Sequence, residues 1–236
     1  ANIVFDDADI ERAVDGSLVN VFSNSGQICI AGSRILVQRQ IAARFTEAFV
    51  ARTRALIVGN PLDAETEVGP MAFKAHWQRV LDHIERAKLE GATLLCGGEA
   101  RRDLGGGYFV APTVFQVDNN QVALCQEEVF GPVVSIQVFD DDDEALSIAN
   151  DSRFGLVGYC WTRSLARAQT FQQQVDAGTL WINTPLARDL RAPFGGFKES
   201  GIGRDGPRQA AEFFTEEKAT ITAVGNTPIR KLGHSR

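Results

Sequence analysis

Apolar residues recur with a helical period in some segments of the chain and with a strand period in others. The helical spacing predicts helices over residues 9–22, 41–56, 73–89, 142–150 and 164–175. Short apolar or alternating runs predict strands over residues 34–38, 93–96, 133–139, 157–162 and 179–183. Because the two kinds of segment alternate, we expect an α/β fold with a mainly parallel sheet and flanking helices.

The ends of the chain carry further expectations. Residues 213–224 alternate again and predict a C-terminal strand, so we divide the chain into a body, residues 1–205, and a C-terminal strand and tail, residues 206–236. The chain begins without a methionine and runs directly into apolar residues 3–5, as expected of a piece of a larger fold. Asp6 or Asp7 is placed to cap the first helix.

Composition narrows the classes of function. The net charge of −6 and the dispersed Lys and Arg residues argue against a nucleic-acid surface, and no segment has the length and apolarity of a membrane span. The four cysteines form no CxxC pair, so neither a disulfide framework nor a zinc ribbon is indicated, and a reducing cytoplasm is expected. We assign no metal, because the acidic run 140–144 is explained by the start of a helix.

Cys29 is the leading candidate for chemistry. It lies in a loop of small residues, 25–33, directly after the first predicted helix. Neighbouring glycines let backbone N–H groups and a substrate carbonyl approach the sulfur, as a nucleophile requires. Most cysteines are instead small buried hydrophobes, and we assign that role to Cys96, Cys125 and Cys160.

Two other segments have the character of ligand-binding loops. Residues 126–132, Gln-Glu-Glu-Val-Phe-Gly-Pro, precede a predicted strand, and residues 188–201 form a long glycine-rich loop. Since ligands of parallel sheets gather at the carboxyl ends of strands, we expect these loops and the Cys29 loop at that edge. Residues 201–206 fit the dinucleotide fingerprint GxGxxG, but they follow a loop and not a strand, so we do not assign them to a cofactor.

In this order and spacing, the segments resemble the aldehyde dehydrogenase superfamily. Gly-Gln-Ile-Cys at 26–29 is similar to that family's nucleophile motif, Glu-Glu-Val-Phe-Gly-Pro at 127–132 to its cofactor-ribose motif, and residues 193–204 to its substrate-entry and packing motif. Residues 58–61 and 68–70 resemble a further stretch of the same family. The likeness covers essentially the whole chain, and it implies the fold of that family's catalytic domain.

The resemblance implies roles for single residues. Cys29 would be the thiolate that attacks an aldehyde, giving a thiohemiacetal, then a thioester after hydride transfer to a nicotinamide, and finally the acid. Glu128 would bind the hydroxyls of the nicotinamide ribose, and Phe130 would pack beside that ribose. NAD is the expected cofactor and NADP stays open, because the NAD-binding domain and a general-base glutamate would precede Ala1. The chain alone is therefore expected to lack turnover.

Two segments resemble one branch of the family more closely and indicate a substrate class. Residues 188–191 ahead of Pro-Phe-Gly-Gly, and the ending 227–233, resemble the branch that acts on muconic semialdehydes from aromatic ring cleavage. Arg188 or Arg191, together with Phe194, would then bind a carboxylated aldehyde, since a guanidinium holds a carboxylate bidentately. An ion pair of either arginine with Asp189 or with a neighbouring subunit carries nearly equal weight.

The family's last strand adds to the sheet of a partner subunit, so the resemblance implies a homodimer or homotetramer. Two other functions stay open: a cysteine acyl-transfer or esterase module without redox chemistry, and a non-catalytic oligomerisation module.

Overall fold

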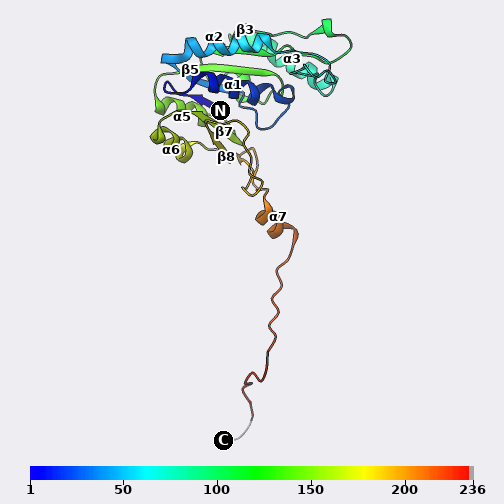
Figure 1. Ribbon diagram of the computed structural model, residues 1–236, viewed down its shortest axis with the longest axis vertical. Helices are drawn as coiled ribbons and strands as arrows, with labels where there is room; N and C mark the ends of the chain where they lie inside the picture. Colours follow the sequence, from blue (N-terminus) through cyan, green and yellow to red (C-terminus); the bar gives the residue numbers. More distant parts are fainter. Residues whose placement is uncertain (234–236) are drawn as a thin grey trace.

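Seven strands form one sheet in the computed structural model, which describes residues 1–233. Their order across the sheet is β3-β4-β5-β2-β1-β7-β8, and all neighbours are parallel except β3 and β4. The strands are β1 Asn2–Val4, β2 Arg34–Gln38, β3 Thr93–Cys96, β4 Thr113–Val117, β5 Val133–Phe139, β7 Val157–Trp161 and β8 Thr179–Ile182. Two short strands, β6 Phe154–Gly155 and β9 Phe197–Lys198, pair separately and antiparallel. The α/β class and the mainly parallel sheet are confirmed (Figure 1).

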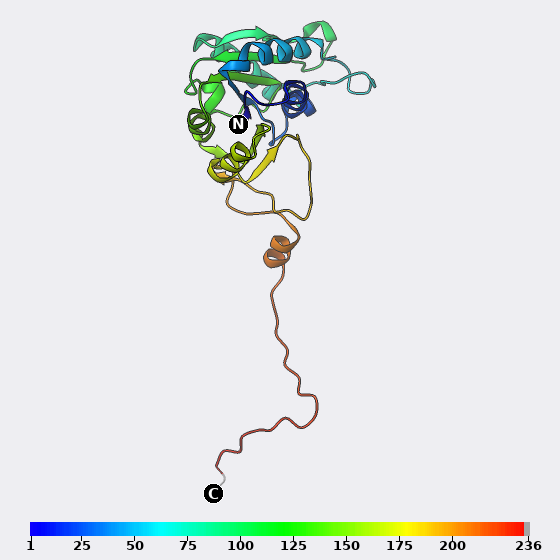
Figure 2. The same cartoon turned by 60° about the vertical axis from the view of Figure 1, so that its left-hand side comes forward.

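Helices cover both faces of the sheet (Figures 1 and 2). They are α1 Ile10–Phe22, α2 Arg39–Ala55, α3 Lys74–Leu89, α4 Ala123–Gln126, α5 Asp142–Asn150, α6 Leu165–Gln174 and α7 Pro207–Phe214, with 3-10 turns at Ser23–Gly26 and Arg102–Leu104. Helices α1 and α2 pack on one face, and α3 to α6 pack on the other. Each face of the sheet thus buries its own apolar core. The helices cover the two faces of the sheet, so the loops at the amino and carboxyl ends of the strands are left to form sites.

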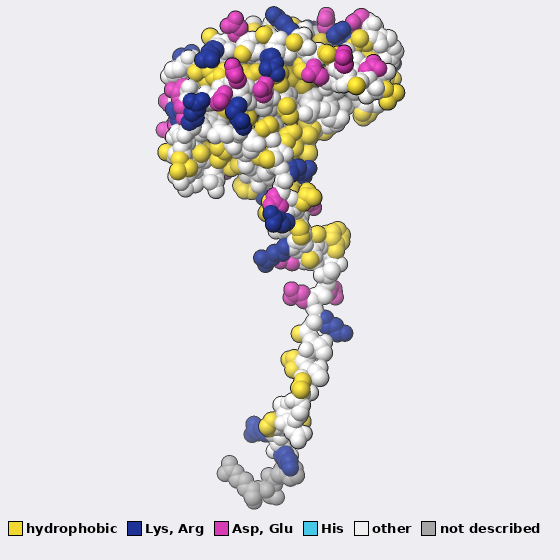
Figure 3. Space-filling view, viewed as in Figure 1, with side chains coloured by type: hydrophobic (Ala, Val, Ile, Leu, Met, Phe, Trp, Pro, Cys, Tyr) yellow, Lys and Arg dark blue, Asp and Glu magenta, His cyan; other side chains and the backbone are white. Residues whose placement is uncertain are grey.

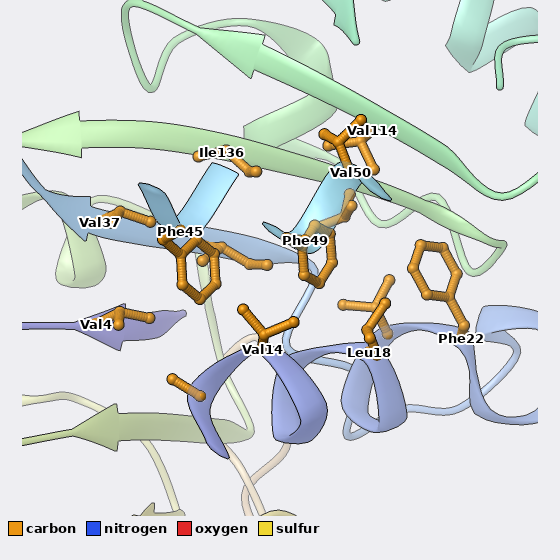
Figure 4. Close-up of a cluster of buried hydrophobic side chains, with 14 of the residues drawn as sticks. Val4, Val14, Leu18, Phe22, Val37, Phe45, Phe49, Val50, Val114 and Ile136 are labelled. Carbon is orange, nitrogen blue, oxygen red and sulfur yellow. The ribbon is translucent and has the colours of Figure 1, made fainter. Parts of the chain in front are cut away.

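The core between α1, α2 and the sheet supports the start of the Cys29 loop. Aromatic rings stack in series across the two helices, with centroids 5.8 Å apart for Phe45 and Phe49 and 6.2 Å apart for Phe22 and Phe49. Figure 4 shows these side chains facing one another below the strands that carry Val37 and Ile136. Since α1 ends at Phe22, this packing fixes the point from which the loop departs.

The first helix is capped two or three residues later than the sequence suggests. Asp9, not Asp6 or Asp7, accepts a hydrogen bond from the Arg12 N–H and caps α1. Asp6 and Asp7 instead accept hydrogen bonds from Arg167 of α6. This ion-paired cluster lies at the carboxyl end of β1, and tertiary contacts have therefore overridden a local capping preference.

The C-terminal strand predicted over residues 213–224 does not form in the described chain. Phe213 and Phe214 belong to α7, and residues 215–233 carry neither helix nor strand and lead away from the body (Figures 1 and 3). A strand needs hydrogen-bonding neighbours, and this segment has no sheet edge beside it. The last three residues of the predicted tail, 234–236, lie outside the described residues.

The surface carries charges of both signs. On the face shown in Figure 3, Lys and Arg side chains alternate with Asp and Glu over the body. Within residues 1–233 no helix combines the length and the apolarity needed to cross a bilayer.

Candidate active site

Cys29 and Glu128 open into one cavity of about 370 Å³. The cavity follows the amino ends of the parallel strands, because its lining includes the residues that enter β2 and β7, among them Ser33 and Val157. The expectation of a site at the carboxyl edge is therefore wrong for these two residues. At the carboxyl edge, Arg167 forms ion pairs with Asp6 at 2.6 Å and with Asp142 at 2.9 Å.

Three consecutive residues with positive φ shape the loop ahead of Cys29. Asn24, Ser25 and Gly26 have φ values of 51°, 57° and 71°. Ser25 donates its hydroxyl to the Gly69 carbonyl at 2.9 Å, which offsets part of the cost of a left-handed serine. A Cβ at position 26 would overlap the Gly131 carbonyl oxygen, so only glycine lets this loop lie against the segment that follows Glu128.

A second anchor holds the same loop from the side. Gln27 accepts the Ala72 N–H on its side-chain oxygen at 2.9 Å and donates its amide to the Asn24 carbonyl at 3.2 Å. Segment 68–72 therefore touches the nucleophile loop at two points. The Cys29 loop is therefore held by contacts with the backbone of two distant segments, residues 69–72 and Gly131.

The thiol of Cys29 lies on an exposed turn, which the Ala31 N–H closes by donating to the Ile28 carbonyl at 3.1 Å. The other three cysteines are buried, as predicted. Burial raises the pKa of each of these thiols, and for Cys160 the pKa reaches about 12. Among the described residues Cys29 is thus the one thiol that a substrate can reach.

Glu128 and its neighbour Glu127 differ in their contacts. Glu127 accepts a hydrogen bond from Arg86 at 2.8 Å and is held in an ion pair. Glu128 is exposed, and within residues 1–233 its carboxylate accepts no hydrogen bond and forms no ion pair. An unpartnered carboxylate beside a cavity is free to accept hydroxyl donors of a ligand.

Phe130 is held by its backbone. Its φ is 56°, and its carbonyl oxygen lies 2.6 Å from Nε2 of the buried His76. Arg79 donates to His76 Nδ1 at 2.9 Å, so Nε2 carries the proton and donates to Phe130. The ring of Phe130 does not line the cavity of Cys29 within the described residues. His76 thus ties α3 to the Glu128 loop.

The candidate substrate residues lie on a separate loop. Arg191 pairs with Asp189 at 2.6 Å, whereas Arg188 lies over the ring of Phe194 with 5.5 Å to its centroid. Phe194 packs against a cluster that includes Ile28, which precedes Cys29. Neither arginine lines the cavity of Cys29 in this structure. Of the two alternatives for the arginines, the ion pair with Asp189 is the one observed for Arg191.

Sequence reasoning missed several residues that build the site. Tyr159 is fully buried, and its hydroxyl donates to the carbonyl of Ile30 at 2.7 Å. Ser25 and Gly69 meet across 44 residues of sequence. The repeated glycines at 26, 69 and 131 were the available signal, because glycine permits two backbones to approach closely.

The chain is similar in sequence and in structure to aldehyde dehydrogenases. The aldehyde dehydrogenase family model matches residues 1–220. A betaine aldehyde dehydrogenase of Agrobacterium fabrum is 46% identical over 224 residues, which are 94% of this chain and 45% of that protein. The crystal structure of HpcC from Thermus thermophilus superposes with a TM-score of 0.89 at 41% identity, covering 95% of this chain and 46% of that one. The crystal structure of a Staphylococcus aureus betaine aldehyde dehydrogenase in complex with NAD⁺ superposes with a TM-score of 0.87 at 42% identity, covering 90% of this chain and 43% of that one. The chain thus spans less than half the length of these relatives.

Proposed function

The chain belongs to the aldehyde dehydrogenase family, and we propose that it carries the nucleophile of an NAD-dependent enzyme that oxidises an aldehyde to its acid. The observation that carries this proposal is the shared cavity of Cys29 and Glu128. One residue supplies an accessible thiol, and the other supplies a free carboxylate.

The chemistry of Cys29 follows from the reactivity of a thiolate. The sulfur attacks the aldehyde carbon, a C–S bond forms, and the carbonyl oxygen becomes an oxyanion to which the Cys29 N–H donates. The C=O bond re-forms as hydride leaves, so a thioester remains on Cys29. Water then attacks the thioester and gives up a proton to a base or to solvent, the C–S bond breaks, and the acid departs as the thiolate is regenerated.

The residues present fit the nicotinamide end of the cofactor. Glu128 would accept hydrogen bonds from the two ribose hydroxyls, because no group in residues 1–233 competes for its carboxylate. Phe130 would pack beside that ribose, at the place where His76 fixes its backbone. When bound, the nicotinamide ring supplies the hydride acceptor. The similar Staphylococcus aureus enzyme, solved with NAD⁺, supports NAD as the cofactor.

For the substrate, we propose an aldehyde that bears a carboxylate, as in the semialdehydes of aromatic catabolism. Arg188 is the candidate to bind it, because it forms no ion pair among the described residues while Arg191 is neutralised by Asp189. Phe194 joins Arg188 to the apolar cluster next to Cys29. Betaine aldehyde, the substrate in the names of several relatives, carries a positive charge, and a free guanidinium would repel it.

We propose that the chain assembles through its tail and acts in the cytoplasm. The body, residues 1–205, would hold the chemistry, and the tail from residue 206 would join a second copy in a homodimer or homotetramer. The exposed Phe213 and Phe214 of α7, which are 82% and 80% exposed, support this role of the tail. A reducing cytoplasm would keep the exposed Cys29 thiol free for catalysis. Light scattering on the purified chain measures the mass of the assembly.

The activity is tested in an enzyme assembled from this chain and the amino-terminal half of the Agrobacterium relative. We expect NADH formation from an aldehyde, abolished by Cys29→Ser and kept by the matched Cys96→Ser. Glu128→Gln should raise the KM for NAD about tenfold, while Glu127→Gln should leave it unchanged. Full turnover of the Cys29→Ser enzyme would refute the assignment of the nucleophile.

Substrate preference is tested in the same assembled enzyme. A carboxylated semialdehyde should show the higher kcat/KM, and Arg188→Ala should lower it by tenfold or more, on the order of 1.5–3 kcal/mol for a charged hydrogen bond. Arg191→Ala is the matched control and should have little effect. A preference for betaine aldehyde that survives Arg188→Ala would reject the carboxylated substrate.

A further inference from the structure

The turn that carries Cys29 rests on a buried phenol. Tyr159 of β7 has no exposed surface, and its hydroxyl donates to the carbonyl of Ile30, the residue after Cys29, at 2.7 Å. Burial, and after it the charge of a Cys29 thiolate, raises the pKa of Tyr159, so the hydroxyl keeps its proton and remains a donor. This hydrogen bond joins strand and turn across 129 residues of sequence.

The ring of Tyr159 is fixed on further sides. Gly32 leaves room for it, because a Cβ there would lie 3.1 Å from the ring carbon Cδ2. Trp181 of β8 stacks on it with centroids 5.1 Å apart and planes inclined by 10°. Trp181 in turn donates its indole N–H to the Ala187 carbonyl at 2.6 Å, at the start of the loop of Arg188. The phenol therefore has little freedom to move away from the turn.

We propose that Tyr159 is a positioning residue for the Cys29 nucleophile. Its hydroxyl holds the Ile30 carbonyl, and the bond from the Ala31 N–H to the Ile28 carbonyl closes the same turn, so the Cys29 sulfur and backbone N–H are held in a fixed relation. The proposal rests on the function proposed above, because positioning has a catalytic consequence only if Cys29 is the nucleophile. A Tyr159 that merely fills the core would leave the turn and its thiol unchanged when the hydroxyl is removed.

The variant that removes the hydroxyl and keeps the ring is Tyr159→Phe. Tyr108→Phe is its matched control, since Tyr108 is the other tyrosine of the chain, is 37% exposed and packs against Trp77. Hydrogen exchange of the purified chain, followed by peptide mass analysis, reports on the turn without any need for activity. We expect exchange of residues 28–32 to be about fivefold to tenfold faster in Tyr159→Phe, with residues 157–161 still protected, since one net hydrogen bond is lost.

Two further readouts connect the turn to chemistry. In the assembled enzyme Tyr159→Phe should lower kcat about fivefold to tenfold and leave the KM for NAD unchanged. In the chain alone, the rate of iodoacetamide alkylation of Cys29 at one fixed pH should change in Tyr159→Phe and not in Tyr108→Phe, because the Ile30 carbonyl has lost the donor that holds the turn.

The outcomes separate this proposal from the proposed function. Unchanged exchange at residues 28–32 overturns the positioning role whatever the activity. Faster exchange with an unchanged kcat in an active enzyme overturns it as well. If the unmodified assembled enzyme shows no turnover, the proposed function fails, and hydrogen exchange of the purified chain still decides on the turn: faster exchange of residues 28–32 in Tyr159→Phe but not in Tyr108→Phe supports positioning, and unchanged exchange rejects it.

Discussion

Gly26→Ala tests whether the Cys29 loop and the Glu128 loop form one rigid unit. Gly26 has a φ of 71°, and an added Cβ would overlap the Gly131 carbonyl oxygen. That oxygen would have to retreat by about 1 Å to restore the 3.0 Å that Cβ atoms keep from other atoms. The substitution therefore combines backbone strain with a steric conflict between two loops.

The two costs can be separated with a second glycine. Gly91 has a similar φ of 88°, but a Cβ there meets nothing within 4 Å, so Gly91→Ala carries only the backbone strain. We expect about 1–2 kcal/mol of destabilisation from the left-handed alanine in both variants. In Gly26→Ala the overpacking adds about 1–3 kcal/mol.

Urea unfolding of the purified variants measures the difference in their free energies of unfolding, because a shift of the urea midpoint with an unchanged denaturant slope reports a change in stability. The midpoint of Gly26→Ala should lie clearly below that of Gly91→Ala, and alkylation of Cys29 should change in Gly26→Ala alone. Equal midpoints would mean that the Gly131 carbonyl moves aside with no loss of stability. That result would refute the reasoning that the Cys29 loop and the Glu128 loop form one rigid unit.

Three further predictions concern the body of the chain. Burial alone would raise the pKa of Asp7, but hydrogen bonds from Thr162 and Arg163 and the charge of Arg167 outweigh it and hold the pKa below its ordinary value of 3.8. The stabilisation by the charged Asp7 is then complete above pH 3.8 and is lost as pH falls through the lower pKa of the folded state. Asp7→Asn should therefore be about 1–2 kcal/mol less stable than wild type at neutral pH. The urea midpoints of the two proteins should converge in acid. Phe49→Ala should cost about 3–5 kcal/mol in the same assay, because the ring is fully buried in the core beneath the Cys29 loop. Iodoacetamide should label Cys29 in the folded chain and Cys160 only after unfolding, since the pKa of Cys160 is about 12; peptide mapping that found equal rates would contradict the burial.

Hydrophobic periodicity predicted most of the fold. The strands over 34–38, 93–96 and 133–139 and the helix over 142–150 match the structure to the residue. Strand β1 was missed because its three residues are too few to show a period, and only its position between β2 and β7 makes it a strand. Helix α7 was not predicted, and its last two residues, Phe213 and Phe214, were assigned to the predicted strand instead.

The site was less accessible to sequence reasoning than the fold. Motif resemblance selected Cys29 and Glu128, and the structure brings both to one cavity, but the expected carboxyl edge was wrong. Both loops lead into strands, β2 and β5, and therefore lie at the amino ends of those strands, whereas the expectation followed the general rule for ligands of parallel sheets. The roles of Tyr159 and His76 depend on carbonyl groups of residues 129 and 54 positions away, and no local pattern encodes such contacts.

The acceptors that fix the site have a consequence for how it could evolve or be redesigned. The carbonyls of Gly69, Phe130, Ile30 and Ala187 receive the hydrogen bonds that hold the Cys29 turn and the loops around it. Every residue supplies a carbonyl, so mutation of the acceptor side chains leaves these bonds possible. Substitutions within residues 184–195 can therefore change the side chains that this loop presents while the Ala187 carbonyl still receives its hydrogen bond from Trp181.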